Sequence, residues 1–435
     1  MSLFEKRSLG VAVIAVATSF ATLPAMSQVQ LDFWSEFSAS PGLESITAIV
    51  EAFNEANPDI VVTHTGFENT PYETALKTSF AGGSPADIVQ VNAGGAMFQY
   101  AEAGQLLDLS DFIAESGVTV RPGLDTFYKL GGRAWGIPLV LNIGNLLYFN
   151  ADMLAEQGID PQSLNTWNGL LEAAETFKQA GIAPIAFGNQ EGWPGNHLHN
   201  HLLLRLFGYE DYVSVWFRTL DPTAAGEARF TDQEETVSWE MFKELQDRGY
   251  FTAGYLADNY PAAYRLFLNE EAPIFIMGSW FLANIQSIAP DMNFGVIPFP
   301  EVEGYPGKQT DLVTAGLVVS ITESSEHPEE AKRFLEYLMS EPVQRQWAEE
   351  TVGLTPYVYD TSNWDYSDEF KRIAELLANS TAAVPFGDML EDQACNVPWT
   401  WQASQGILTG DITPEEVGQG HEDCVTDLMS TKFGI

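Results

Sequence analysis

The chain has 435 residues, 45% of them hydrophobic and 18% charged, which is enough for about two or three domains with sizeable cores. It carries 60 acidic and 20 basic side chains, giving a formal net charge of −40 at pH 7. So acidic a surface repels nucleic-acid phosphates and anionic lipid headgroups. We therefore expect neither nucleic acid nor a membrane surface as a binding partner.

The first 27 residues have the pattern of a secretory signal peptide. Lys6 and Arg7 precede a mostly apolar stretch at 9–23, and small residues at 25–27 offer a cleavage site before Gln28. No cysteine comes directly after the apolar stretch, where a lipid would be attached, so we expect no lipid anchor. The later apolar runs are too short and too often interrupted to span a bilayer. The mature chain is therefore predicted to lie free in the periplasm.

Cys395 and Cys424 are the only two cysteines in the sequence. In an oxidising compartment such a pair is expected to form a disulfide, worth roughly 3–4 kcal/mol of stability in a chain-entropy model. The alternative is two buried free thiols. Neither cysteine lies in a CxxC motif, so we expect no catalytic or metal-binding role for them.

From residue 28 onward, short apolar runs alternate with longer amphipathic ones, a pattern typical of an α/β protein with a largely parallel sheet. Strands are predicted at 29–34, 60–64 and 87–91, with helices at 46–56 and 72–81 between them. Right-handed crossovers place the carboxyl ends of these three strands at one edge of a sheet. Ligands of open α/β sheets bind at that edge.

Further strand-like and helical segments follow along the chain. Strands are predicted at 138–150, 182–187, 273–277, 294–298 and 312–321. Helices are predicted between them at 167–180, 234–248 and 328–339.

Seven short motifs occur in a fixed order. They are YETALKTSFAGGSPADIV (72–89), AGQLLDL (103–109), WGIP (135–138), NLLYFNAD (145–152), TWNGL (166–170), MGSW (277–280) and PEEAKRFL (328–335). Each motif is weak alone, but together they resemble family 1 extracellular solute-binding proteins, the sugar-binding subunits of ABC importers related to maltose-binding protein. The resemblance covers about residues 30–360 and weakens toward the C-terminus.

The resemblance implies two α/β lobes, joined by a hinge, that close on a sugar held between them. The first lobe would comprise 28–138 with 314–352, and the second 143–311 with 357–435. The hinge crossings would lie near 138–143, 311–316 and 353–357. The family role is a monomeric receptor that delivers its solute to a membrane permease powered by a cytoplasmic ATPase.

A sugar site needs aromatic rings for the apolar face of the sugar and polar side chains for its hydroxyls. Such residues follow the predicted strands or lie in the crossings, and the Trp280 position resembles a sugar-stacking tryptophan of the family. For each aromatic residue, core packing is the alternative. The predicted ligand-binding residues are Trp34, Glu36, Glu68, Asn69, Tyr72, Asn92, Asn142, Trp193, Trp280, Gly316 and Tyr357.

Basic residues are sparse near these positions, which favours a neutral mono- or oligosaccharide or a glycosylated polyol. Arg133, Arg205 and Arg265 are the basic side chains that would change this prediction by reaching the cleft. Two alternatives remain open: a receptor for a polyamine or another cationic solute, and a secreted glycan-degrading enzyme with two carboxylates.

No catalytic or cofactor-binding motif is present. His197 and His201 have the spacing of two metal ligands on a helix. The glutamate of a zinc-hydrolase motif is missing, and we predict no metal and no cofactor.

Overall fold

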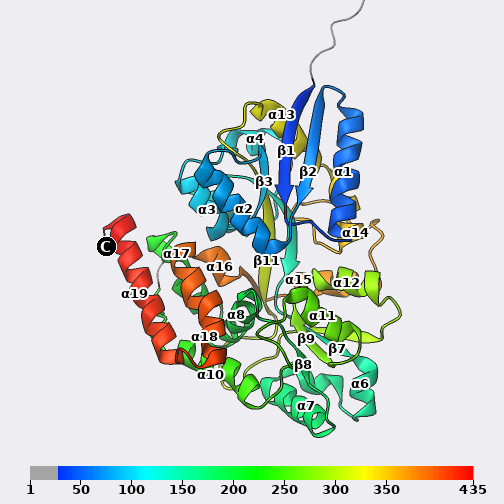
Figure 1. The fold of residues 1–435 in the computed structure, drawn as a ribbon, viewed down its shortest axis with the longest axis vertical. Helices are drawn as coiled ribbons and strands as arrows, with labels where there is room; N and C mark the ends of the chain where they lie inside the picture. The colour runs from blue at the N-terminus through cyan, green and yellow to red at the C-terminus, as the bar shows by residue number, and fades with distance from the viewer. Residues whose placement is uncertain (1–27, 225, 435) are drawn as a thin grey trace, which may run out of the picture.

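The computed structural model describes residues 28–224 and 226–434, apart from the side chains of residues 69, 70 and 224. The predicted signal peptide at 1–27 lies outside the described residues. Figure 1 shows two lobes, one above the other, with a mixed sheet in each and helices on the outside.

The first lobe begins with the predicted βαβαβ unit. Its elements are β1 (Val29–Ser35), α1 (Gly42–Ala56), β2 (Ile60–Gly66), α2 (Asn69–Gly82) and β3 (Ile88–Asn92). Strand β1 lies between β2 and β3 and runs parallel to both. The three carboxyl ends therefore meet at one edge, as the sequence predicted.

The first sheet is mixed rather than largely parallel. Strand β11 (Asp311–Ile321) runs antiparallel to β3 and to β6 (Ile137–Ile143), and parallel to β12 (Ala382–Pro385). The difference arises because β6 and β11 join the two lobes, and β11 returns into the first sheet from the opposite direction (Figure 1).

The predicted run at 138–150 forms two strands in different sheets. After β6 the chain turns at Gly144 and Asn145 into β7 (Leu146–Asn150). The Asn145 side chain fixes this turn, because it donates to Asp311 O and accepts from Val313 N. The second sheet has the order β10-β7-β9-β8. Its other strands are β8 (Ile185–Ala186), β9 (Ile274–Met277) and β10 (Phe294–Pro298).

Helices cover both sheets. Besides α1 and α2, the helices of the first lobe are α3 (Gly95–Glu102), α4 (Ser110–Glu115), α5 (Asp125–Tyr128), α13 (Pro328–Met339) and α14 (Glu341–Thr351). The first lobe also contains a short hairpin of β4 (Lys129–Leu130) and β5 (Arg133–Ala134). Helix α13 begins at Pro328, has acidic residues in its first turn and buries one apolar face, as its sequence predicted.

The second lobe is richer in helix. Its middle part contains α6 (Ala151–Glu156), the 3-10 helix η1 (Pro161–Asn165), α7 (Trp167–Gln179), α8 (Trp193–Phe207), α9 (Tyr209–Phe217), the 3-10 helix η2 (Pro222–Ala224), α10 (Gln233–Asp247), α11 (Tyr260–Leu268) and α12 (Phe281–Ile288). Its C-terminal part contains α15 (Asp368–Ala378), α16 (Gly387–Leu390), α17 (Gln393–Asn396), the π-helix η3 (Val397–Gln402), α18 (Ala403–Thr409) and α19 (Pro414–Phe433).

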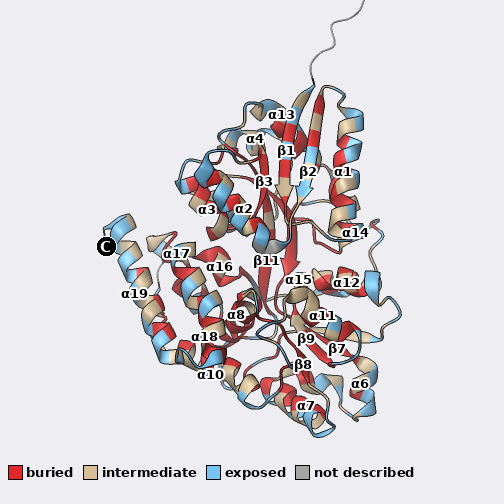
Figure 2. Ribbon diagram, viewed as in Figure 1, coloured by how far each residue is buried: buried red, intermediate tan, exposed pale blue. Residues whose placement is uncertain are grey.

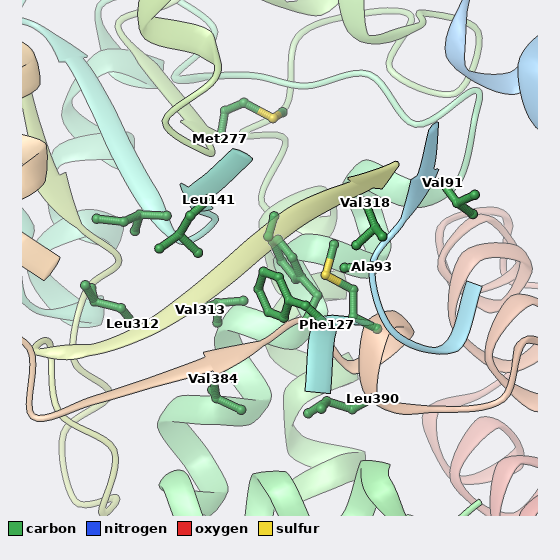
Figure 3. Packing of buried hydrophobic residues seen from close by; sticks show 14 of the residues in the cluster. Val91, Ala93, Phe127, Leu141, Met277, Leu312, Val313, Val318, Val384 and Leu390 are labelled. Carbon is green, nitrogen blue, oxygen red and sulfur yellow. The ribbon is translucent and has the colours of Figure 1, made fainter. Parts of the chain in front are cut away.

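The apolar cores of the two lobes meet along β11. One buried cluster contains Val91 and Phe127 of the first lobe together with Met277 and Leu390 of the second. Figure 3 shows these side chains on both sides of β11. Figure 2 shows β11 buried and the outer helix faces exposed, and every residue of β6 is buried, so these two crossing strands lie in the interior of the molecule.

The predicted disulfide is confirmed. Cys395 and Cys424 are bonded, with their Cα atoms 5.7 Å apart. Since Cys395 lies in α17 and Cys424 in α19, the bond fastens the long C-terminal helix to the segment that follows β12.

Candidate ligand-binding site

The carboxyl edge of the first sheet gathers several predicted ligand-binding residues. Trp34 and Glu36 lie at the end of β1, Asn92 ends β3, and all three are half-buried. Gln90 of β3 links that strand to the end of β1, because its side-chain oxygen accepts a hydrogen bond from the Glu36 backbone N–H at 2.9 Å. Tyr72 is buried, and its hydroxyl donates to the backbone oxygens of Trp34 and Gln90. It therefore supports this edge and presents little surface to a ligand.

A polar pocket opens beside this edge. The first lobe lines it with Glu36, Glu73, Gln90 and Asn92, and the second lobe contributes Gln393 of α17. The pocket therefore lies between the lobes. Burial raises the pKa of Glu73, and the nearby charge of Lys77 partly opposes the shift.

Two other predicted residues lie at the start of α2. Glu68 is exposed and precedes the helix. Asn69 is the first residue of the helix, and its side chain lies outside the described residues.

The second lobe supplies a cluster of aromatic rings. Trp193 begins α8, and its ring lies 5.0 Å from that of His197 and 5.4 Å from that of Tyr260. His197 in turn lies 6.0 Å from Trp280 and stacks on Phe386 at 3.8 Å. Trp193 and Trp280 are half-buried, so each keeps part of its ring exposed.

Asn142 connects this cluster to the crossing strand β6. It is nearly buried, and its side-chain oxygen accepts from Ser279 Oγ at 3.1 Å. The Ser279 backbone N–H donates to Ile143 O at 2.7 Å. Trp280, the next residue, is thereby held against the crossing.

Asp388 and Trp401 also belong to this region, although neither is among the predicted ligand-binding residues. Asp388 lies in α16, directly after β12, and its Oδ1 atom is buried without a hydrogen-bond partner among the described residues. Burial, together with the charge of Glu73, raises the pKa of Asp388 to about 7, and the Trp401 indole partly opposes the shift. A strand prediction at 382–385 would have drawn attention to Asp388, because Asp388 comes shortly after that strand, as Glu36 comes after β1.

Two predicted residues do not lie with the others. Tyr357 is fully buried, and its hydroxyl donates to Pro138 O at 2.7 Å. Tyr357 and Tyr359 pack in the core of the first lobe, so Tyr357 presents no ring to the cleft. Gly316 is buried in β11, where a Cβ atom would overlap the Phe127 ring, so this glycine permits close packing. Burial in the core is the physical reason that both depart from the predicted ligand-contacting role.

None of the three arginines considered from the sequence lines the polar pocket. Arg205 is fully buried and donates to the backbone oxygens of Phe299, Pro300 and Asp311. Arg133 is exposed and lies 3.5 Å from Asp108, and Arg265 lies over the Tyr264 ring. Lys77 is the basic residue that lines the pocket.

The histidine pair on α8 faces rings rather than a cation. His201 is buried 5.3 Å from the Phe299 ring, and His197 stacks on Phe386. Within residues 28–224 and 226–434, no group of three His, Cys, Asp or Glu side chains is placed to hold a metal ion. In the same part of the chain, we find no helix with the length and apolar character needed to cross a membrane.

Two curated relatives cover most of the chain. The chain is 24% identical over 416 residues to an uncharacterized ABC transporter extracellular-binding protein of Pyrococcus horikoshii, covering 93% of this chain and 85% of the relative. It is 25% identical to the multiple sugar-binding protein of Streptococcus mutans, covering 68% and 67% of the two chains.

Structural comparison agrees with the two-lobe fold. A solved chitin oligosaccharide binding protein matches with a TM-score of 0.81 at 22% identity, covering 92% of this chain and 99% of that one. The family model described as bacterial extracellular solute-binding protein matches residues 39–345. That match spans more than half of the chain and confirms the resemblance found in the sequence, so the chain belongs to the bacterial extracellular solute-binding protein family.

Proposed function

We propose that this chain is the solute-binding component of an ABC importer and that its solute is a neutral carbohydrate. The observation that carries the proposal is the polar pocket between the lobes, which Glu36, Gln90 and Asn92 line from the first lobe and Gln393 from the second. The second lobe also carries a cluster of aromatic rings that includes the half-buried Trp193 and Trp280. Hydroxyls suit the polar side and an apolar sugar face suits the rings.

The relatives support the same assignment. One is named as a multiple sugar-binding protein, and another as an extracellular-binding protein of an ABC transporter. The residues that we propose to contact the sugar are Trp34, Glu36, Glu68, Asn69, Asn92, Asn142, Trp193 and Trp280.

The proposal includes a cleaved signal peptide at 1–27, a periplasmic location without a lipid anchor, a monomeric receptor and a membrane permease as partner. The proposal keeps the three predicted hinge crossings as the boundaries between the lobes. Only the end of the third crossing is moved, from residue 357 to beyond Tyr359, because Tyr357 and Tyr359 pack in the core of the first lobe. The lobes would close because the closed state contacts the sugar better than the open state does.

The test is a thermal-shift and tryptophan-fluorescence screen of residues 28–435. The panel contains maltose, galactose, raffinose and xylobiose, with glucuronate and spermidine as charged alternatives. A sugar at about 100 times its Kd should add about 2.7 kcal/mol of stability and raise the Tm. Recovery of that sugar unchanged supports a receptor. A response to spermidine alone would favour the cationic alternative, and hydrolysis of the sugar would favour an enzyme.

A further inference from the structure

The polar pocket between the lobes is small. Its free volume is about 30 Å³, which is room for roughly two water-sized groups. The lobes touch beside it, because a Cβ atom on Gly94, two residues after the pocket residue Asn92, would overlap the backbone oxygen of Met389. In this closed arrangement the pocket admits a hydroxyl or hydroxymethyl group that protrudes from a sugar, while the sugar ring lies outside it.

Gln90 of β3 brings a hydrogen-bond donor without an acceptor to this pocket. Its side chain is fully buried and lines the pocket. Because the Glu36 backbone N–H can only donate, the side-chain oxygen of Gln90 must face it, and the two atoms lie 2.9 Å apart. The amide nitrogen, Nε2, therefore points away from Glu36 and has no hydrogen-bond partner among the described residues. A buried N–H group without an acceptor is costly, so Gln90 has a donor available to a ligand.

Gln393 of α17 brings an acceptor to the same pocket from the second lobe. Its Nε2 atom donates to the Asp388 backbone oxygen at 2.7 Å. Because a carbonyl oxygen can only accept, the nitrogen and not the oxygen of the Gln393 amide must face Asp388. This leaves the Gln393 oxygen, Oε1, as the atom that the side chain offers to a ligand. The two amides therefore have fixed and opposite polarity, a donor from the first lobe and an acceptor from the second.

The two amides together restrict the chemistry of the ligand. Gln90 needs an acceptor and Gln393 needs a donor, and a hydroxyl group is both. An ammonium group only donates and a carboxylate only accepts, so neither satisfies both amides. The charged residues Glu36, Glu73 and Lys77 line the same pocket, but none of them accepts a hydrogen bond from Gln90 Nε2.

We propose that a hydroxyl group of the sugar enters this pocket, accepts a hydrogen bond from Gln90 and donates one to Gln393. This inference rests on the proposed function, and it specifies two contacts of the sugar that the sequence did not predict. Because Gln90 belongs to the first lobe and Gln393 to the second, the hydroxyl group joins the lobes. The closed state thereby gains a contact that the open state lacks, which is the condition for a ligand to favour closure.

Gln99 of α3 is the alternative acceptor. It also lines the pocket, and its Nε2 atom donates to the Ala96 backbone oxygen at 2.8 Å, so its own oxygen is turned the other way. A hydroxyl group held between Gln90 and Gln99 would contact the first lobe alone and would not join the lobes. Helix α3 packs against α17, so the experiment must separate Gln99 from Gln393.

The experiment combines variants of residues 28–435 with modified sugars, and the Kd is measured by calorimetry. The sugar is whichever of maltose, galactose, raffinose and xylobiose binds in the screen, and each of its monodeoxy derivatives lacks one hydroxyl group. In the wild type, loss of the hydroxyl group that enters the pocket should raise the Kd about 10- to 100-fold, since two hydrogen bonds are lost.

Variants separate direct contact from a structural role. In Gln90→Met and in Gln393→Met, loss of the same hydroxyl group should raise the Kd about fivefold less than in the wild type, because one of its two partners is gone. In the double variant the loss should change the Kd less than about twofold. A structural role would instead weaken the parent sugar and every deoxy derivative alike. Gln162→Met, which replaces an exposed glutamine of η1, is the matched control and should behave like the wild type.

Two results would overturn the proposal. In the first, each deoxy derivative binds more weakly than the parent sugar by the same factor in Gln90→Met and Gln393→Met as in the wild type. In the second, Gln99→Met reduces the effect of the missing hydroxyl group and Gln393→Met does not, so the hydroxyl group is held by the first lobe alone.

Failure of this inference and failure of the proposed function give different results. If a sugar binds and either of the two overturning results appears, the receptor role stands and the bridging hydroxyl group is refuted. If no sugar in the panel binds, the proposed function fails, and the contacts of Gln90 and Gln393 with a sugar fail with it. Binding of spermidine or glucuronate in place of a sugar would also contradict the requirement for a group that both donates and accepts.

Discussion

Trp280 illustrates how one side chain is positioned for binding. Its backbone follows Ser279, which is hydrogen-bonded to both Asn142 and Ile143 of the crossing strand. Its ring lies beside the ring of His197 and stays half-buried. The sequence identified this residue through its position after a strand and its resemblance to a family position. The rings near Trp280 are those of His197 on α8 and of Phe386, which follows β12. The local sequence pattern around Trp280 did not predict that these two segments lie beside it.

Truncating Trp280 tests its role in binding. Trp280→Ala should weaken sugar binding about tenfold, since an aromatic contact is worth about 0.5–1.5 kcal/mol beyond the area that it buries. The measurement is the Kd by calorimetry. Tyr209→Ala, which removes an exposed ring on α9 away from the cluster, is the control and should leave the Kd unchanged. Equal affinity of both variants would remove Trp280 from the site.

Buried histidines make a second prediction at the residue scale. Burial lowers the pKa of His64 to about 4 and the pKa values of His197 and His421 to about 3, and it also lowers that of His201. In the unfolded chain these groups titrate near pH 6.5. Their contribution to stability is therefore complete above that value and is lost as the pH falls toward the folded-state pKa values.

We expect the Tm to fall as the pH is lowered from about 6.5 to 4, because the unfolded state binds more protons there. Differential scanning calorimetry across this range measures how steeply the Tm falls with pH. His197→Phe keeps a ring against Phe386 but binds no proton when the chain unfolds, so the Tm of this variant should fall less steeply with pH than that of the wild type. An unchanged slope in this variant would contradict the neutral state of His197.

At the scale of elements, the sequence predicted those whose pattern is local. Helix α13 shows its start, its acidic first turn and its buried face in consecutive residues, and its predicted range agrees with the structure. The run at 138–150 was predicted as one strand. The run divides into two strands because Gly144 and Asn145 form hydrogen bonds to β11, which lies about 165 residues later in the sequence. The periodicity of the run itself cannot indicate a contact with so distant a segment.

The C-terminal helix is stabilised by a contact of the same long-range kind. Helix α19 is joined to α17 by the disulfide, with 29 residues of sequence separation. Replacing both cysteines with serine should cost about 3–4 kcal/mol of unfolding free energy, because the unfolded chain regains loop freedom. Denaturant unfolding of the double variant and of the reduced wild type measures this. A loss below about 1 kcal/mol in both would show that α19 is held by packing alone.

At the scale of the whole molecule, α19 also reaches the opposite lobe. Lys432 lies 2.8 Å from Glu102 on α3 and 2.6 Å from Asp392 just before α17. Opposite charges stabilise one another most where water is partly excluded, and the Lys432 side chain is only 19% exposed. This contact joins the lobes on the side where α3 and α17 approach one another.

Lys432→Met should therefore favour the open arrangement and weaken sugar binding by about two- to tenfold. The Kd and the radius of gyration from small-angle scattering, with and without sugar, measure both effects. Lys371→Met removes an exposed lysine paired within α15 and serves as the control. An unchanged Kd and an unchanged radius in Lys432→Met would show that the contact does not hold the lobes together.

The sequence by itself determined the first βαβαβ unit, helix α13, the disulfide and the family, because strand and helix periods, the cysteine count and ordered motifs can be read without knowing which distant segments meet. It also identified polar and aromatic residues at the strand ends. The tertiary structure decided which of them meet. Tyr357 is taken into the core, whereas Gln393 is brought to the cleft from a segment beyond residue 345, where the family match ends. Such choices depend on packing between residues hundreds of positions apart, and a local pattern carries no record of that packing.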